Sequence, residues 1–181
     1  ENFSGFAPFQ LRACQTILER IDSNNPTATL ISAGTGSGKT KAVYLPAFCY
    51  LASVKSESSW TKMLSLYPRN ELLKDQLRVA LLESRELSNK KGITLSVGTF
   101  FGGTPKDFTS VKSRTDWQEK NGNLICPFLT CLICSSELHL TEGYGRLELS
   151  CSECGDIISD KELILTREQL SKTPPDLLLT T

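Results

Sequence analysis

Short apolar runs and helical patterns alternate along this chain. Residues 27–32, TATLIS, form an apolar and β-branched run of the kind that buried strands carry. Residues 62–67, 93–99 and 176–180 form three further strand-like runs. In the segment KTKAVYLPAFCYLA, which begins at Lys39, apolar residues recur at helical spacing. Strands that alternate with helices predict the α/β class with one parallel sheet.

A cysteine-rich segment interrupts this alternation between the third and fourth predicted strands. Four of its cysteines form two C-x2-C pairs with sixteen residues between the pairs. This is the spacing of a zinc ribbon, in which each pair forms a tight knuckle and residues 138–149 between them fold as a hairpin. We expect the zinc-binding module to be an insertion that spans residues 106–172. Its predicted Zn²⁺ ligands are Cys131, Cys134, Cys151 and Cys154.

The remaining cysteines and the single histidine leave alternatives open. Cys126 lies close enough in sequence to replace one of the four ligands, whereas His139 is expected to face solvent on a strand. Cys14 and Cys49 fall in predicted helices, where a free cysteine behaves as a small buried hydrophobe. An iron–sulfur cluster, or a site without metal, stays an alternative to zinc.

Composition and charge narrow the classes of function. The chain has 181 residues, of which 39% are hydrophobic and 22% are charged, as in ordinary globular domains. Its 20 basic and 20 acidic residues balance, so any nucleic-acid surface has to be a local patch. The chain has neither an apolar run near 18 residues nor a charged and apolar leader, so we expect a cytoplasmic protein without membrane contact.

The segment SAGTGSGKT has the chemistry of a phosphate-binding loop. Glycine can adopt positive φ, which lets successive backbone N–H groups turn toward an anion, and the helix that begins near Lys39 adds the positive end of its dipole. The Lys39 ammonium can reach the β and γ phosphates of a nucleotide, and the Thr40 hydroxyl can ligate Mg²⁺. The predicted phosphate-binding residues are Gly34, Thr35, Gly36, Ser37, Gly38, Lys39 and Thr40.

Ala33 gives this loop the form A-x-x-G-x-G-K-T, which resembles motif I of superfamily 2 helicases of the DEAD/DEAH type. The preceding segment LRACQTIL is similar to the L-R-x-x-Q element that recognises adenine in these proteins. The resemblance assigns this role to Gln15. Gln10, which follows the aromatic Phe9, is the alternative.

Three later segments resemble nucleic-acid-binding elements of the same superfamily. YPRNELLKDQ is similar to motif Ia, which assigns a phosphate contact to Arg69. The turn FGGTP is similar to the G-x-T-P element, and PPDLLLTT is similar to the strand that ends in motif Ic. The resemblance thereby adds Thr104, Thr180 and Thr181 as contacts to a nucleic-acid backbone.

The resemblance implies a RecA-like ATP-binding lobe, formed by residues 1–105 and 173–181, of an ATP-dependent helicase or translocase. It implies ATP and Mg²⁺ as ligands, DNA as the expected nucleic acid and further domains of the same protein as partners. The residues in these motifs are most similar to those of large bacterial helicases of anti-phage defence and DNA repair.

In this superfamily an acidic motif and a second lobe with an arginine finger complete catalysis, and both are expected beyond Thr181. Residues 1–181 are therefore expected to bind ATP without hydrolysing it. Two other classes stay open. One is a P-loop kinase or GTPase, and the other is a non-enzymatic zinc-ribbon interaction module.

Overall fold

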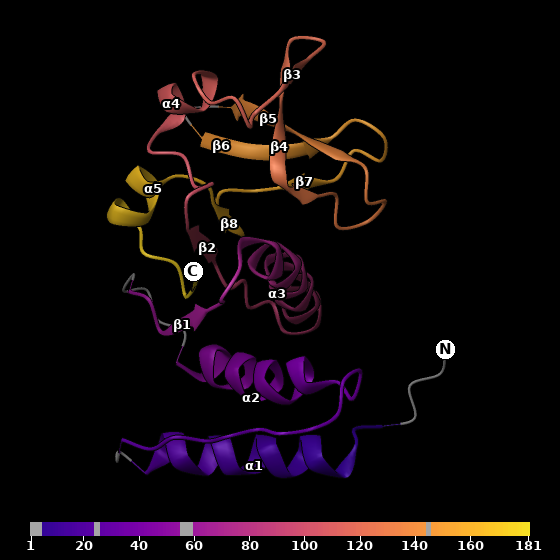
Figure 1. Cartoon of the computed structure of the whole chain (residues 1–181), viewed down its shortest axis with the longest axis vertical. Helices are drawn as coiled ribbons and strands as arrows, with labels where there is room; N and C mark the ends of the chain where they lie inside the picture. The colour runs from indigo at the N-terminus through magenta and orange to yellow at the C-terminus, as the bar shows by residue number, and fades with distance from the viewer. Residues whose placement is uncertain (1–4, 24–25, 55–59, 144–145) are drawn as a thin grey trace. The chain divides into compact units, whose positions relative to one another are not determined.

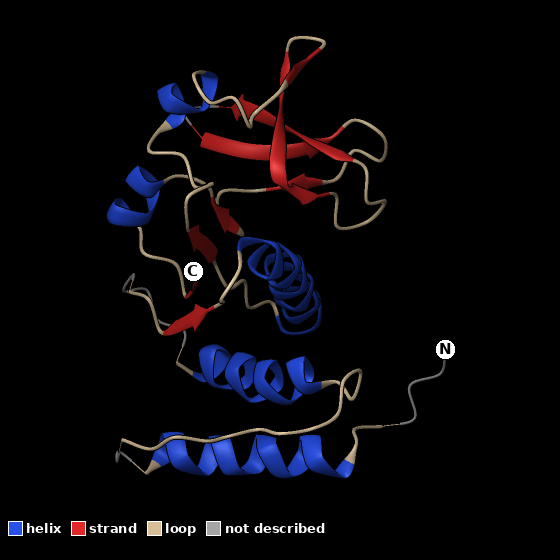
Figure 2. Cartoon of the chain, viewed as in Figure 1, coloured by secondary structure: helices blue, strands red, loops and turns tan. Residues whose placement is uncertain are grey.

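The computed structural model describes residues 5–23, 26–54, 60–143 and 146–181. The chain forms two compact units, Glu1–Lys55 and Ser56–Thr181. Each unit is described by itself. Figures 1 and 2 show the course of the chain and its helices and strands.

The first unit is a pair of packed helices, α1 (Pro8–Asp22) and α2 (Lys39–Ser53). Proline is well placed at the start of α1, because the first turn of a helix leaves its N–H groups without helical partners. On α2, Tyr44 and Phe48 are buried, and their rings meet edge to face with centroids 5.7 Å apart.

The strand predicted at residues 27–32 is absent from this unit, and that prediction is wrong for this structure. Residues 26–34 are without regular secondary structure, and the Leu30 side chain is 94% exposed. A strand forms only where its backbone groups pair with a neighbour, and no described residue forms a ladder with this segment. Instead, the Arg20 guanidinium donates hydrogen bonds to the Ala28 carbonyl and the Thr29 hydroxyl.

The second unit contains a parallel sheet of four strands in the order β1-β9-β2-β8. Three of these strands confirm strands in the runs predicted at residues 62–67, 93–99 and 176–180, although β2 begins only at Val97. The strands are β1 (Met63–Leu66), β2 (Val97–Phe100), β8 (Leu163–Ile164) and β9 (Leu177–Thr180).

The long helix α3 (Asn70–Lys91) packs against this sheet (Figure 2). Leucines recur at helical spacing on α3, and three of them, Leu73, Leu77 and Leu81, are fully or almost fully buried. Gly92 ends the helix with φ of 69°, which glycine adopts without a steric cost. Two short helices, α4 (Phe108–Lys112) and α5 (Arg167–Lys172), also belong to this unit.

A buried ion pair joins the starting ends of three parallel strands. The Lys62 ammonium lies 2.8 Å from the Asp176 carboxylate, and their side chains are 1% and 4% exposed. The same carboxylate accepts hydrogen bonds from the backbone N–H and the hydroxyl of Ser96. These residues come just before β1, β9 and β2, so one carboxylate fixes how the three strands begin.

An antiparallel sheet with strand order β3-β4-β5-β6-β7 lies between β2 and β8 in sequence. Its central hairpin joins β5 and β6 and confirms the hairpin predicted at residues 138–149. The strands are β3 (Glu119–Lys120), β4 (Asn123–Thr130), β5 (Glu137–Gly143), β6 (Arg146–Cys151) and β7 (Ile157–Ile158).

The range 106–172 predicted for the inserted module also contains β8. This strand pairs with β2 in parallel, so the chain has rejoined the first sheet by residues 163–164. The reason is that Leu163 and Ile164 are buried apolar residues that extend the edge of the parallel sheet beside Val97 and Gly98. The boundaries of a separately folding module stay a prediction.

Candidate functional site

The phosphate loop joins the unpaired segment to α2. Gly36 and Gly38 have φ of 75° and 83°, the left-handed conformation in which this loop needs glycine. The Lys39 ammonium donates hydrogen bonds to the carbonyls of Ala33 and Gly34, at 2.7 and 2.6 Å, and so lies across the mouth of the loop. α2 begins at Lys39, as predicted, so its N-terminal N–H groups face the same place. These residues fit a nucleotide phosphate.

Gln10 rather than Gln15 lies against this loop. The Gln10 side chain is buried, its amide nitrogen donates to the Gly38 carbonyl at 3.0 Å, and its amide oxygen accepts from the Ala7 N–H at 2.8 Å. A Cβ atom on Gly38 would lie 2.5 Å from that nitrogen, so the contact also requires glycine there. Gln15 is exposed on α1.

The carboxyl ends of β1, β9 and β2 lie level with one another in the second unit. Leu66 and Phe100 are both register partners of Thr180, whose hydroxyl donates to the Phe100 carbonyl at 2.6 Å. Arg69 follows β1 by three residues, is exposed and immediately precedes the first residue of α3. Thr181 is exposed beyond β9. An exposed cation, a helix N-terminus and the strand ends therefore share one edge of the sheet.

Thr104 is not open to solvent at this edge. It is 1% exposed, and its hydroxyl donates to the Thr99 carbonyl at 2.8 Å and accepts from the Phe101 N–H at 3.1 Å. Its side chain therefore shapes the turn from within, which does not favour the predicted direct phosphate contact. Gly102 is the exposed residue of this turn.

A cavity of about 260 Å³ opens beside the same turn. The N-terminal turns of α3 contribute Asn70 and Lys74, and the segment after α4 contributes Arg114 and Asp116. The Arg114 guanidinium binds the Asp116 carboxylate at 2.7 Å, and this hydrogen bond holds the pKa of Asp116 below its ordinary value. Both charges of the pair are thus retained near neutral pH.

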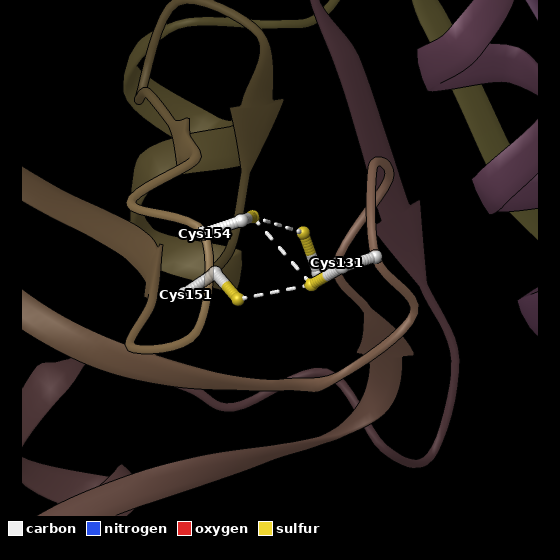
Figure 3. A group of neighbouring side chains, drawn as sticks. Cys131, Cys151 and Cys154 are labelled. Carbon is white, nitrogen blue, oxygen red and sulfur yellow. Dashed lines mark hydrogen bonds between the residues drawn. The ribbon is translucent and has the colours of Figure 1, made fainter.

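The four cysteines of the two C-x2-C pairs meet in space. Their sulfur atoms all lie within 4.8 Å of one another, and Figure 3 shows those of Cys131, Cys151 and Cys154 turned toward a common centre. The Sγ atom of Cys134 lies 3.5 Å from those of both Cys151 and Cys154. A tetrahedral Zn²⁺ site with Zn–S bonds of about 2.3 Å places its sulfur atoms about 3.8 Å apart. The tetrad therefore fits zinc.

The two knuckles have the same backbone geometry. In the first, the Cys131 N–H donates to the Ser136 carbonyl and the Ser135 N–H donates back to the Cys131 carbonyl. In the second, Cys151, Gly155 and Asp156 form the corresponding pair of hydrogen bonds. Ser135 and Gly155 both have positive φ, of 63° and 73°. Each turn thus presents two sulfur atoms on one side.

Cys126 lies apart from the tetrad, in β4, where it is buried. Burial raises the pKa of its thiol to about 12, so it stays protonated at neutral pH. The thiols that meet in space are those of Cys131, Cys134, Cys151 and Cys154, so Cys126 is not one of the clustered ligands.

Sequence reasoning missed two arginines of α3 that contact the knuckles. Arg78 donates to the carbonyls of Cys131 and Leu132, and Arg85 binds the carboxylates of Asp156 and Glu162. Desolvation works against the charge of Arg85, but hydrogen bonds with the two carboxylates raise its pKa. The seven-residue spacing of the arginines, which places them on one side of a helix, was the only indication in the sequence. It does not show which segment they contact.

Comparison with known families matches residues 7–119 to the family described as DEAD/DEAH box helicase. The match covers more than half of the chain, includes the phosphate loop and Arg69, and ends before the first knuckle. No curated protein and no solved structure matches the chain significantly. Across residues 5–181, apart from the short gaps in the description, no helix is long and apolar enough to cross a membrane.

Proposed function

The chain belongs to the DEAD/DEAH box helicase family, and on this premise we propose that it is the ATP-binding lobe of a motor that moves along DNA. Domains of this family are RecA-like and use ATP with Mg²⁺. One observation carries the nucleic-acid part of the proposal. Arg69, the N-terminus of α3 and the ends of β2 and β9 share one edge of the parallel sheet.

For the nucleotide, we assign the phosphates to the loop that ends in Lys39 and Thr40. When bound, Mg²⁺ neutralises phosphate charge, and the Thr40 hydroxyl is the ligand that this chain offers to it. Lys39 would exchange the carbonyls of Ala33 and Gly34 for phosphate oxygens. We assign adenine recognition to Gln10, because its contact with Gly38 ties the glutamine to the phosphate loop.

For the nucleic acid, the proposed contacts are to phosphates. Arg69 supplies a full positive charge, and the first turn of α3 supplies N–H groups and the positive end of a helix dipole. The Thr180 and Thr181 strand end and the exposed Gly102 border the same edge. Contacts of this kind carry little sequence information, which suits a motor that must move along any sequence.

We also propose that Cys131, Cys134, Cys151 and Cys154 hold one structural Zn²⁺. The support is the tight packing of the four sulfur atoms and the matched geometry of the two knuckles. A closed site with four protein ligands leaves no open position for catalysis, so the metal would stabilise the antiparallel sheet rather than take part in ATP hydrolysis.

The function is tested on residues 1–181, two variants and one control variant. Fluorescence anisotropy is measured with labelled Mg²⁺-ATP, and with single-stranded DNA of several sequences at several salt concentrations. Lys39→Ala should abolish ATP binding. Arg69→Ala should weaken DNA binding similarly for every sequence and lower the salt slope by about 1. Lys91→Ala, at the opposite end of α3, removes the same charge and should leave DNA binding unchanged.

Other outcomes would redirect the proposal. A loss of binding that depends on DNA sequence would argue against backbone contacts at Arg69. A preference for GTP, or rapid ATP hydrolysis by residues 1–181, would favour a self-contained P-loop enzyme. Binding of RNA with the same sequences, measured alongside the DNA, shows which of the two nucleic acids the protein prefers.

A further inference from the structure

Helix α3 connects two regions of the second unit that serve different proposed roles. Its N-terminus follows Arg69 at the edge assigned to nucleic acid, and its middle contacts both cysteine knuckles. The helix has 22 residues and is therefore about 33 Å long. Arg78 and Arg85 are seven residues, or two helical turns, apart, so both side chains leave the helix on the same side.

Arg78 holds the first knuckle. One terminal nitrogen of its guanidinium lies 3.3 Å from the Cys131 carbonyl, 3.2 Å from the Leu132 carbonyl and 3.2 Å from the Ser135 hydroxyl. All three acceptors belong to the turn that carries Cys131 and Cys134. The three hydrogen bonds of Arg78 therefore depend on the conformation of this turn.

Arg85 holds the second knuckle more firmly. Its guanidinium binds both oxygens of the Asp156 carboxylate, at 2.8 and 2.9 Å, and also the Glu162 carboxylate and the Ile157 carbonyl. The Asp156 backbone carbonyl in turn accepts from the N–H of Cys151. Nη1 binds the Asp156 carboxylate, Nε binds Glu162 and Nη2 binds the Ile157 carbonyl, so these partly buried contacts fix the orientation of the guanidinium as well as its distance.

The metal ligands are the closest link between the two turns. The first knuckle connects β4 to β5, and the second connects β6 to β7, so they belong to different connections of the sheet. The Asp156 carboxylate, which Arg85 holds, also lies 3.7 Å from the Cys131 sulfur. Four thiolates at these distances repel one another unless a cation lies between them. Zinc would therefore set the positions of both turns, and with them both attachment points of α3.

We propose that Arg78 and Arg85 are positioning residues that couple zinc binding at the cysteine tetrad to nucleic-acid binding at the N-terminus of α3. The coupling rests on the proposed roles of the tetrad and of Arg69. Zinc fixes the knuckles, the knuckles fix the middle of α3, and α3 presents Arg69 and its first N–H groups to the phosphates. Because coupling free energies are reciprocal, bound nucleic acid should also increase the affinity for zinc.

The first test compares zinc-loaded and zinc-depleted residues 1–181 by hydrogen–deuterium exchange. Depletion should speed exchange in α3 by about tenfold or more, while β1 and β9 of the parallel sheet change less. In the zinc-loaded double variant Arg78→Met/Arg85→Met, exchange in α3 should already be fast. Equal exchange in the loaded and depleted wild-type protein would overturn the proposal.

The second test measures zinc release to a coloured chelator. The double variant should release zinc at least about fivefold faster than the wild type, and the charge-conserving Arg78→Lys/Arg85→Lys variant should fall between them. Lys90→Met, on the exposed surface of the same helix, is the matched control and should match the wild type. An unchanged release rate in both arginine variants would show that the contacts only fill space.

The third test links the metal to DNA and separates the two proposals. Zinc depletion should weaken single-stranded DNA binding by about fivefold or more in the wild type, and by less than about twofold in the methionine double variant. Arg69→Ala should weaken DNA binding without changing zinc release. If this variant bound DNA as well as the wild type, only the assignment of the nucleic-acid edge would be refuted. DNA affinity that is independent of zinc in the wild type, with Arg69→Ala still impaired, would refute the coupling alone.

Discussion

At the level of single residues, the two glutamines of α1 differ only in what surrounds them. Gln10 is buried against the phosphate loop through Gly38, whereas Gln15 faces solvent five residues further along. Five residues correspond to 500° of helical rotation at 100° per residue, so the two side chains leave α1 on different sides. Their roles in nucleotide binding should differ accordingly.

Replacing each glutamine by alanine separates these roles. Gln10→Ala should weaken Mg²⁺-ATP binding about tenfold, because it removes the side chain that holds the Gly38 carbonyl and that we assign to adenine. Gln15→Ala makes the same change on the same helix and should leave affinity within about twofold. Isothermal titration with ATP and with a triphosphate lacking adenine checks both the size and the base dependence of the effect. A larger loss for Gln15→Ala would return the adenine role to that residue.

At the level of elements, we expect the antiparallel sheet to depend on metal binding at the cysteine tetrad. Strands β4, β5 and β6 bury apolar side chains such as those of Phe128, Leu138 and Leu149, whereas the edge strands β3 and β7 have two residues each. A closed tetrahedral metal site contributes folding free energy directly and would add to this core. We therefore expect one Zn²⁺ per chain by elemental analysis.

Single cysteine replacements test this dependence. Cys131→Ser should abolish zinc binding and lower the melting temperature by about 10 °C or more, because a closed site with three ligands left loses most of its affinity. Cys126→Ala removes a buried thiol that is not a ligand, and it should keep the full zinc content despite a small loss of packing. Stoichiometric iron, or loss of zinc from Cys126→Ala, would refute the assigned ligand set.

At the level of the whole molecule, the buried pair of Lys62 and Asp176 joins residues that lie 114 positions apart. Asp176 also binds Ser96, so the pair brings together the beginnings of three strands from distant parts of the sequence. Removing one member of such a pair leaves the other charge buried without its counter-ion, which is costly.

Urea unfolding measures that cost. Lys62→Met should lower the free energy of unfolding by about 3 to 5 kcal/mol. Lys172→Met breaks the exposed pair with Glu168, and it should change the free energy of unfolding by less than about 1 kcal/mol. The double variant Lys62→Met/Asp176→Asn should recover part of the loss, because no charge then stays buried. If Lys62→Met and Lys172→Met lowered the free energy of unfolding equally, the buried pair would contribute no more to stability than the exposed one.

Much of the fold and of the candidate sites could be predicted from local sequence patterns. The phosphate loop, the start of α2 at Lys39, three parallel strands and the cysteine tetrad all follow from residue types at short, fixed spacings. Such spacings constrain geometry directly, because a helix turn, a strand alternation or a two-residue knuckle involves only near neighbours in the chain. The level strand ends at Thr180 follow from the same logic, since parallel strands end on one edge.

Only the tertiary structure decided which of these residues meet partners that lie far away in sequence. It placed Gln10 rather than Gln15 at Gly38, buried the Thr104 hydroxyl inside its own turn, and left residues 27–32 without a paired strand. It also brought two arginines of α3 to knuckles more than 50 residues away. The sequence alone cannot determine such contacts, because local spacing is compatible with many packings and the burial of distant side chains selects one of them.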